Sequence, residues 1–197
     1  MDGSYRKSLI TGNRGLRGMT VYPKAGLMFW TDWGDDNNGQ ILQASMDGSN
    51  AKTIIDKKQV TWPNGLKVDS TTDRLYWVDM HRRHVCSSKL DGSDITELTT
   101  NLNNPFGVAV FENYVYWTDF KGQKIYKANK FTGEEVKSFD ESFFAPLDVN
   151  VYHPLVQAKG KKGHPMLPVL NNLLPQILIL SFPSVQFYLL FVAENTH

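Results

Sequence analysis

Cysteine is almost missing from this chain of 197 residues, which contains only Cys86. One cysteine cannot form a disulfide within the chain, so a fold stapled by disulfides is excluded. Free cysteines are mostly buried, and we interpret Cys86 as a small apolar residue of a strand. A catalytic thiol would need an activating base, and His84 only shares a strand face with it.

The usual signatures of catalysis and of charged ligands are also absent. The net charge of +1 gives no reason to expect nucleic acid or an anionic membrane. There is no glycine-rich phosphate loop, nucleophile elbow or cluster with metal-ligand spacing. His81 and His84 fit no zinc pattern, so we interpret them as loop and strand surface residues, with proton sensing as the alternative. We therefore expect no enzyme, no metal site and no cofactor.

One short pattern, by contrast, is present three times. Residues 27–32 read Leu-Met-Phe-Trp-Thr-Asp, and related runs occupy residues 75–79 and 115–119. Their tryptophans recur at intervals of 47 and 40 residues. β-Branched and aromatic residues at this density favour a half-buried strand, and the Gly, Asn and Asp that close each run argue against a helix. Intervals of this length are typical of stacked repeat units.

Each copy lies within the same sequence of signals. A Pro-x-Gly segment precedes it, and an alternating run follows that ends in Asp47-Gly48-Ser49 or Asp91-Gly92-Ser93. Asp-Gly between alternating runs predicts a type I′ hairpin turn. One unit is then four short antiparallel strands, which is a propeller blade. Full blades are predicted at residues 19–56, 65–100 and 107–140, and one more inner strand without a partner at residues 148–153.

The first residues repeat a turn found further along. Met1-Asp2-Gly3-Ser4 duplicates residues 46–49, so the chain is expected to begin inside a blade. Residues 5–10 would then be the outer strand of a truncated blade. No charged and apolar leader precedes this turn, and Asn-x-Ser/Thr is absent, so the sequence reads as a fragment without a secretion signal.

These residues resemble the YWTD (class B) repeats of the low-density lipoprotein receptor family. The segments 62–65, 75–79 and 90–93 follow the family pattern in order, and residues 145–154 resemble the segment that ends such propellers. The resemblance implies an all-β, six-bladed propeller in a receptor ectodomain, followed by a cysteine-rich EGF-like module. We expect an incomplete propeller of about three four-stranded blades, a half-blade and a lone strand over residues 1–154.

The resemblance also implies function. We expect a non-enzymatic protein-interaction module of an endocytic receptor, extracellular on a plasma-membrane or endosomal protein, with lipoprotein or signalling proteins as ligands. Its other partners would be the missing blades and EGF-like modules, with calcium bound in neighbouring modules. A Wnt co-receptor or a nidogen-like matrix protein are the alternatives. A propeller enzyme would need several inward acids, and only Asp69 and Asp148 are candidates.

The repeated residues and the loops are assigned different roles. In the family, the repeated Trp and Asp are structural, the Asp bonding backbone groups near the blade junction. That role falls to Trp30, Asp32, Trp77, Asp79, Trp117 and Asp119. In a four-stranded meander the loop between strands two and three lies at the same end as the link to the next blade. Aromatic and charged residues gathered there resemble an interface hot spot, although Trp62 and Phe106 could instead only seal blade junctions. The expected binding face contains Trp33, Asp35, Asp36, Trp62, Met80, His81, Arg82, Phe106 and Phe120.

Residues 155–197 do not follow the repeat. The basic run Lys159 to Lys162 leads into an apolar run at residues 177–193, which includes Pro183. We expect an irregular, poorly ordered tail outside the family pattern. A membrane anchor flanked by the lysines and a segment packed on a partner are the two alternatives.

Overall fold

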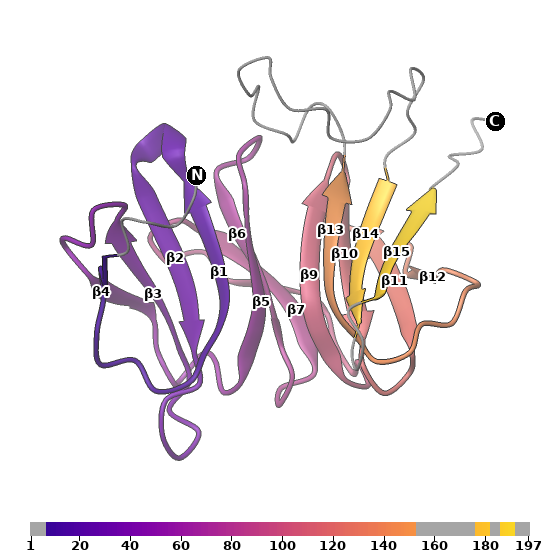
Figure 1. Cartoon of the computed structure of the whole chain (residues 1–197), viewed down its shortest axis with the longest axis horizontal. Coiled ribbons are helices and arrows are strands. Elements are labelled where there is room, and N and C mark those ends of the chain that lie inside the picture. Colours follow the sequence, from indigo (N-terminus) through magenta and orange to yellow (C-terminus); the bar gives the residue numbers. More distant parts are fainter. Residues whose placement is uncertain (1–6, 153–175, 182–185, 192–197) are drawn as a thin grey trace.

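The structure, a computed structural model, describes residues 7–152, 176–181 and 186–191. Within these residues the regular elements are strands and one 3₁₀ turn at Pro23–Ala25. The strands form four antiparallel sheets placed side by side along an arc, with β1–β4 at one end and β13–β15 at the other (Figure 1). The predicted all-β, incomplete propeller is confirmed.

Three of the sheets are four-stranded blades in which each strand pairs with the next along the chain. They coincide with the predicted blades, and each inner strand begins two or three residues earlier than expected. The blades are β1 (Leu16–Tyr22), β2 (Leu27–Asp32), β3 (Gln40–Ser45) and β4 (Lys52–Ile55); β5 (Pro63–Asp69), β6 (Arg74–Asp79), β7 (His84–Lys89) and β8 (Thr96–Thr99); and β9 (Pro105–Phe111), β10 (Tyr114–Asp119), β11 (Lys124–Asn129) and β12 (Lys137–Ser138).

The fourth sheet differs from its expectation. The predicted inner strand is present as β13 (Pro146–Tyr152), but it is paired with β14 (Gln176–Ser181), which pairs in turn with β15 (Gln186–Phe191). Part of the expected irregular tail therefore forms strands, including residues assigned to a possible membrane anchor. The rest of residues 155–197, and the basic run among them, lie outside the described residues.

The hairpin turns differ in type from the prediction. Only Gly48 of the Asp47-Gly48 pair has a positive φ, of 91°, whereas a type I′ turn needs two such residues. The Ser45 N–H instead donates to the Ser49 carbonyl at 2.9 Å, and the Asp47 carboxylate accepts the Ser49 N–H at 2.9 Å. The glycine thus closes a three-residue loop in the left-handed conformation, which suits Asp-Gly equally well.

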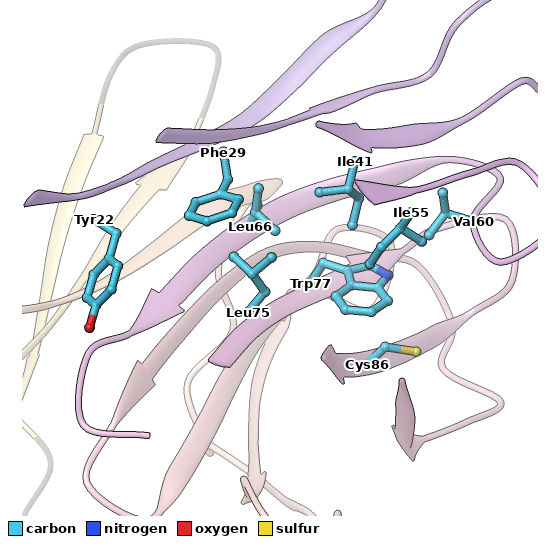
Figure 2. Packing of buried hydrophobic residues seen from close by; sticks show 9 residues of the cluster. All are labelled: Tyr22, Phe29, Ile41, Ile55, Val60, Leu66, Leu75, Trp77 and Cys86. Atoms are coloured by element: carbon cyan, nitrogen blue, oxygen red, sulfur yellow. The ribbon is translucent and has the colours of Figure 1, made fainter. Parts of the chain in front are cut away.

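Apolar side chains fill the junctions between blades. Trp77 on β6 has no exposed surface, and Figure 2 shows Ile41 and Ile55 of the first blade beside its indole. Trp117 occupies the corresponding place in the cluster between the second and third blades. Burial of large aromatic side chains is a main source of stability in such a core. The junction between the first two blades contains Tyr22, Phe29, Ile41, Ile55, Val60, Leu66, Leu75, Trp77 and Cys86.

Glycines let the inner strands approach one another closely. A Cβ at Gly65 would lie 2.6 Å from the backbone nitrogen of Val108 on β9. A Cβ at Gly107 would lie 2.7 Å from the Cα of Asp148 on β13. The Pro-x-Gly segments therefore set the spacing of the strands nearest the axis, because any side chain there would push two backbones apart.

Cys86 and His84 on β7 are both buried. Cys86 is buried, and burial raises the pKa of its thiol. The expectation that His84 is a surface residue is wrong, because it is only 4% exposed. A strand between two blades is covered on both faces, so alternation along β7 does not mark a solvent side.

Candidate functional site

One end of the arc collects the loops between second and third strands together with the links between blades. The three loops are residues 33–39, 80–83 and 120–123, and the links are residues 56–62 and 100–104. The Asp-Gly-Ser turns lie at the opposite end (Figure 1). We call the loop-and-link end the candidate face.

The repeated aspartate of the second blade ties a link to a loop. The Asp79 carboxylate is fully buried and accepts backbone N–H bonds from Thr61 at 2.6 Å, Trp62 at 3.2 Å and Arg82 at 2.9 Å. Hydrogen bonds to a charged acceptor are among the stronger ones in proteins. This one side chain therefore fixes the backbone on both sides of the face where Trp62 and Arg82 emerge.

The other two repeated aspartates make related bonds. Asp32 accepts the N–H of Gly15 at 2.8 Å and of Gly34 at 2.9 Å, and Asp119 accepts that of Gly122 at 2.8 Å. The residue after each aspartate also bonds to the preceding link through the backbone. These bonds run from the N–H of Trp33 to the oxygen of Gly15, from Met80 to Trp62, and from Phe120 to Asn104, at 3.0 to 3.1 Å.

Three aromatic rings on this face stack in a row with an arginine. Trp33 and Trp62 lie 5.6 Å apart with planes at 22°, and His81 meets Trp62 edge-on at 5.1 Å. The guanidinium carbon of Arg17 lies 3.9 Å from the Trp33 ring centre, close enough for a cation–π interaction. We call these four residues the aromatic ladder.

Both indoles of the ladder are held at their polar edges. The Trp33 Nε1–H donates to the Pro63 carbonyl at 3.1 Å, and the Trp62 Nε1–H donates to the Asn37 Oδ1 at 2.6 Å. Asn37 lies in the left-handed region with φ 64°, and its side chain reaches Trp62 in the link to the second blade. These hydrogen bonds hold both indoles in place, and both tryptophans remain partly exposed.

The charged residues expected on this face are exposed, and two of them, Arg82 and Asp35, have partners within the chain. Arg82 donates to the Thr61 hydroxyl at 3.0 Å and to the Lys58 carbonyl at 2.7 Å, which holds it along the link beside the ladder. Asp35 pairs with Arg14 at the surface. Asp36 is exposed, and Met80 is half-buried.

Phe106 and Phe120 form a separate pair. Their ring centres are 6.2 Å apart, and Phe120 is 37% exposed. The aromatic residues expected on the binding face thus divide into the ladder and this pair. Arg17 and Asn37 were missed by the sequence, because neither lies in the repeated motif and only the fold brings them to the tryptophans.

A cavity of about 370 Å³ opens at the axis beside the inner strands. Its lining includes Arg17, Lys67, Phe106 and Asp148. Burial raises the pKa of Asp148, against the charge of Lys67 and a hydrogen bond from Asn150 at 2.9 Å. Lys67 donates to the same Asn150 at 2.8 Å, so a polar chain joins the second blade to the fourth sheet.

The second inward acid proposed from the sequence is already paired. Asp69 accepts from the Lys130 Nζ at 2.7 Å, and both side chains are buried. The described residues contain no group of three His, Cys, Asp or Glu that could hold a metal ion. Asp69 and Asp148 therefore do not combine with further acids in the part of the chain that the structure covers.

The family model for low-density lipoprotein receptor repeat class B matches residues 26–70 and 73–112. The vitellogenin receptor Yl of Drosophila melanogaster is 37% identical over 150 residues, which are 75% of this chain and 7% of that protein. Human low-density lipoprotein receptor-related protein 5 is 34% identical over 121 residues, 61% of this chain and again 7% of the relative. The chain thus spans less than a tenth of the length of these curated relatives.

Among solved structures, the crystal structure of a nidogen/laminin complex contains a similar chain. The TM-score is 0.70 with 21% identity, covering 91% of this chain and 61% of the other. At this identity the likeness concerns the fold. No helix within the described ranges is long and apolar enough to cross a membrane.

Proposed function

Because the chain belongs to the family of low-density lipoprotein receptor class B (YWTD) repeats, we propose that it is a protein-interaction module of an endocytic receptor ectodomain, without enzymatic activity. The observation that carries the proposal is the aromatic ladder, which gathers Arg17, Trp33, Trp62 and His81 on one face. Interface hot spots are enriched in Trp and Arg, held in place and surrounded by weaker contacts.

The rigidity of the face supports this proposal. The buried carboxylate of Asp79 holds the link and the loop, and hydrogen bonds to Pro63 and Asn37 hold the two indoles. A partner that docks here does not have to order these side chains first, which lowers the entropic cost of association. Phe106 and Phe120 would form a second contact on the same face, and Phe106 also lines the axial cavity.

We infer the ligand class from the relatives. Two vitellogenin receptors match 75% and 79% of this chain, so a lipoprotein of the vitellogenin type is the proposed ligand. The proposed setting is extracellular, as part of a longer plasma-membrane or endosomal receptor with further blades and EGF-like modules. A Wnt co-receptor remains the second candidate, since members of the wider receptor family, such as human low-density lipoprotein receptor-related protein 5, also match this chain.

Binding to purified vitellogenin tests the proposal directly. The chain would be immobilised and its affinity measured by surface plasmon resonance for the wild type and for Trp62→Ala. Loss of a hot-spot residue costs about 2 kcal/mol or more, so we expect the dissociation constant to rise roughly thirtyfold.

Phe131→Ala provides the matched control. Phe131 is a 54% exposed aromatic residue on a turn at the opposite end of the third blade, and its removal should leave affinity unchanged. Equal affinity of the wild type and Trp62→Ala, with both proteins folded by circular dichroism, would reject the ladder as the contact. Binding of a Wnt protein in place of vitellogenin would favour the second candidate.

A further inference from the structure

The repeated aspartate of the third blade accepts fewer hydrogen bonds than its counterparts. In the first two blades this aspartate accepts two N–H bonds from the segment before the blade and one from the loop after its own strand. In the third blade, Asp119 accepts only the loop bond, from the Gly122 N–H to its Oδ1 at 2.8 Å. Among residues 7–152 no group donates to its Oδ2. Asp119 is nevertheless only 4% exposed, so its carboxylate is buried with one oxygen unpartnered.

A cavity of about 230 Å³ opens beside this carboxylate, and we call it the Asp119 pocket. Besides Asp119, its lining includes Leu102, Trp117, Tyr126 and Val136, and Asp119 is the one charged residue among the described residues that line it. The pocket lies at the junction of the second and third blades, whereas the aromatic ladder lies at the junction of the first and second. Both blades that meet at the pocket have all four strands among the described residues.

Two stacked rings form one wall of the Asp119 pocket. Trp117 and Tyr126 lie opposite each other on β10 and β11, with ring centres 5.6 Å apart and planes at 12°. The corresponding tryptophans of the first and second blades are paired with Leu42 and Cys86 instead. Aromatic rings attract cations through their faces, and a carboxylate attracts them through its charge. The pocket therefore combines two groups that each favour a cation.

The basic residues nearest to the pocket are engaged elsewhere. Lys124 lies opposite Asp119 in the strand register, but its Nζ donates to the Asp140 carbonyl at 2.8 Å. Arg83 donates through its guanidinium to the Leu102 carbonyl. Neither of these cations is part of the pocket lining. A buried carboxylate without a partner is costly, so a cation that enters from outside the chain would be stabilised here.

We propose that the Asp119 pocket binds the side chain of a lysine presented by a protein partner; that the partner is a protein rests on the proposed function. The ammonium group donates to the Asp119 Oδ2, and the methylene chain lies against Trp117 and Tyr126. A single free oxygen suits the compact ammonium group better than the two-pronged guanidinium of arginine. The cavity is smaller than pockets for drug-sized ligands, so one side chain suffices to occupy it.

An NMR titration of the full chain with Nα-acetyl-lysine methylamide tests the pocket with a single residue. We expect saturable shifts of the Gly122 amide, which donates to the same carboxylate, and of the Trp117 indole N–H. The indole of Trp77, at the other junction, should not move. The norleucine derivative, which lacks only the ammonium group, should give no shift. Equal shifts from both derivatives, or no saturable shift from the lysine derivative, would overturn the proposal.

Variants of the pocket measure the contribution of the carboxylate. Asp119→Asn should raise the dissociation constant of the lysine derivative roughly tenfold or more, because a hydrogen bond to a charged group is lost. Glu135→Gln is the matched control: it removes one exposed negative charge outside the pocket and should leave the constant unchanged. Equal constants for Asp119→Asn and Glu135→Gln would count against the proposal.

A second variant covers the case in which Asp119→Asn does not fold. Val136 is 51% exposed and lines the pocket, so Val136→Lys should fold and place an ammonium group there from within the chain. It should compete with the lysine derivative and raise its dissociation constant. An unchanged constant for Val136→Lys would overturn the proposal.

The titration also separates this proposal from the proposed function. Failure of vitellogenin to bind, with the lysine derivative still bound at the Asp119 pocket, would reject the proposed ligand and support the pocket. Absence of binding by the lysine derivative would reject the pocket, whether or not vitellogenin binds.

Discussion

At the residue scale, a repeated acid can be identified from the sequence but its partners cannot. The recurrence of Asp32, Asp79 and Asp119 predicts a shared role, and the structure adds that their carboxylates receive backbone N–H groups. Burial of His84 was not predictable from alternation, because β7 lies between blades and both its faces are covered. Arg17 was missed for another reason: its contact with Trp33 depends on how the first link folds.

The buried histidine makes stability depend on pH. Burial lowers the pKa of His84 despite the carboxylates of Asp79 and Glu97 nearby. Below about pH 6.5 the unfolded chain takes up a proton at this residue that the folded chain resists. Stability is therefore present above that pH and falls as pH decreases, by at most about 1.4 kcal/mol per pH unit for one group.

Urea unfolding at pH 7.5 and 5.5 checks this expectation. His84→Gln cannot take up the proton, so its midpoint should fall less on acidification than that of the wild type. An identical acid shift for the wild type and His84→Gln would contradict the assignment.

At the element scale, the order of the strands within a blade could be predicted from short sequence motifs. The pairing of strands outside the repeat could not. Each aromatic run with its Pro-x-Gly and Asp-Gly neighbours specified a blade, although the turn around Gly48 is not the predicted type. The pairing of β13 with β14 had no motif behind it, because residues 176–191 carry no copy of the repeat. Contacts between different blades, such as the ion pair of Asp69 with Lys130, could not be predicted from local sequence patterns either.

That ion pair connects the inner strand of the second blade with a turn of the third. Burial alone would raise the pKa of Asp69, but hydrogen bonds from Lys130 and Thr71 outweigh it and hold the pKa below its usual range. Removing one partner of a buried pair costs about 3–5 kcal/mol, so we expect Lys130→Met to lose that much stability. The double variant Asp69→Asn/Lys130→Met should recover part of it, because no charge is left buried alone.

Chemical denaturation measures these differences, with Lys24→Met as control. Lys24 is an exposed lysine paired with Asp73 at 3.3 Å, and its loss should leave the midpoint nearly unchanged. Stabilisation by a depressed carboxyl pKa is present above about pH 4 and is lost as pH falls below it. Lys130→Met should therefore show a smaller acid loss than the wild type. Equal midpoints for Lys130→Met and Lys24→Met would exclude a stabilising role.

At the scale of the whole molecule, each sheet packs only against its neighbours along the arc. The second blade is covered on both sides, and the side chains of Tyr76, Trp77, Val78 and Val85 have no exposed surface. The first blade has a neighbouring blade among the described residues on one side only, and Leu16 and Met19 on its inner strand remain exposed. In repeat architectures stability is approximately a sum of units and their interfaces, so the middle unit should be the last to open.

Native-state hydrogen exchange can measure that order. Backbone amides of β6 and β7 should exchange most slowly, and those of β2 and β3 faster, because opening at the end of the arc breaks one interface and not two. Slower exchange in β2 than in β6 would contradict this gradient.

The difference between the two tryptophan intervals has a consequence for engineering. From the first blade to the second, the interval is seven residues longer than the next one, and five of those residues lie on the candidate face. Three belong to loop 33–39, compared with loop 80–83, and two to link 56–62, compared with link 100–104. The two longer segments contain Trp33, Asn37 and Trp62, while the strand lengths stay the same. If the candidate face binds a protein ligand as proposed, exchanging these two segments between propellers should transfer ligand specificity while the strands of the blades stay unchanged.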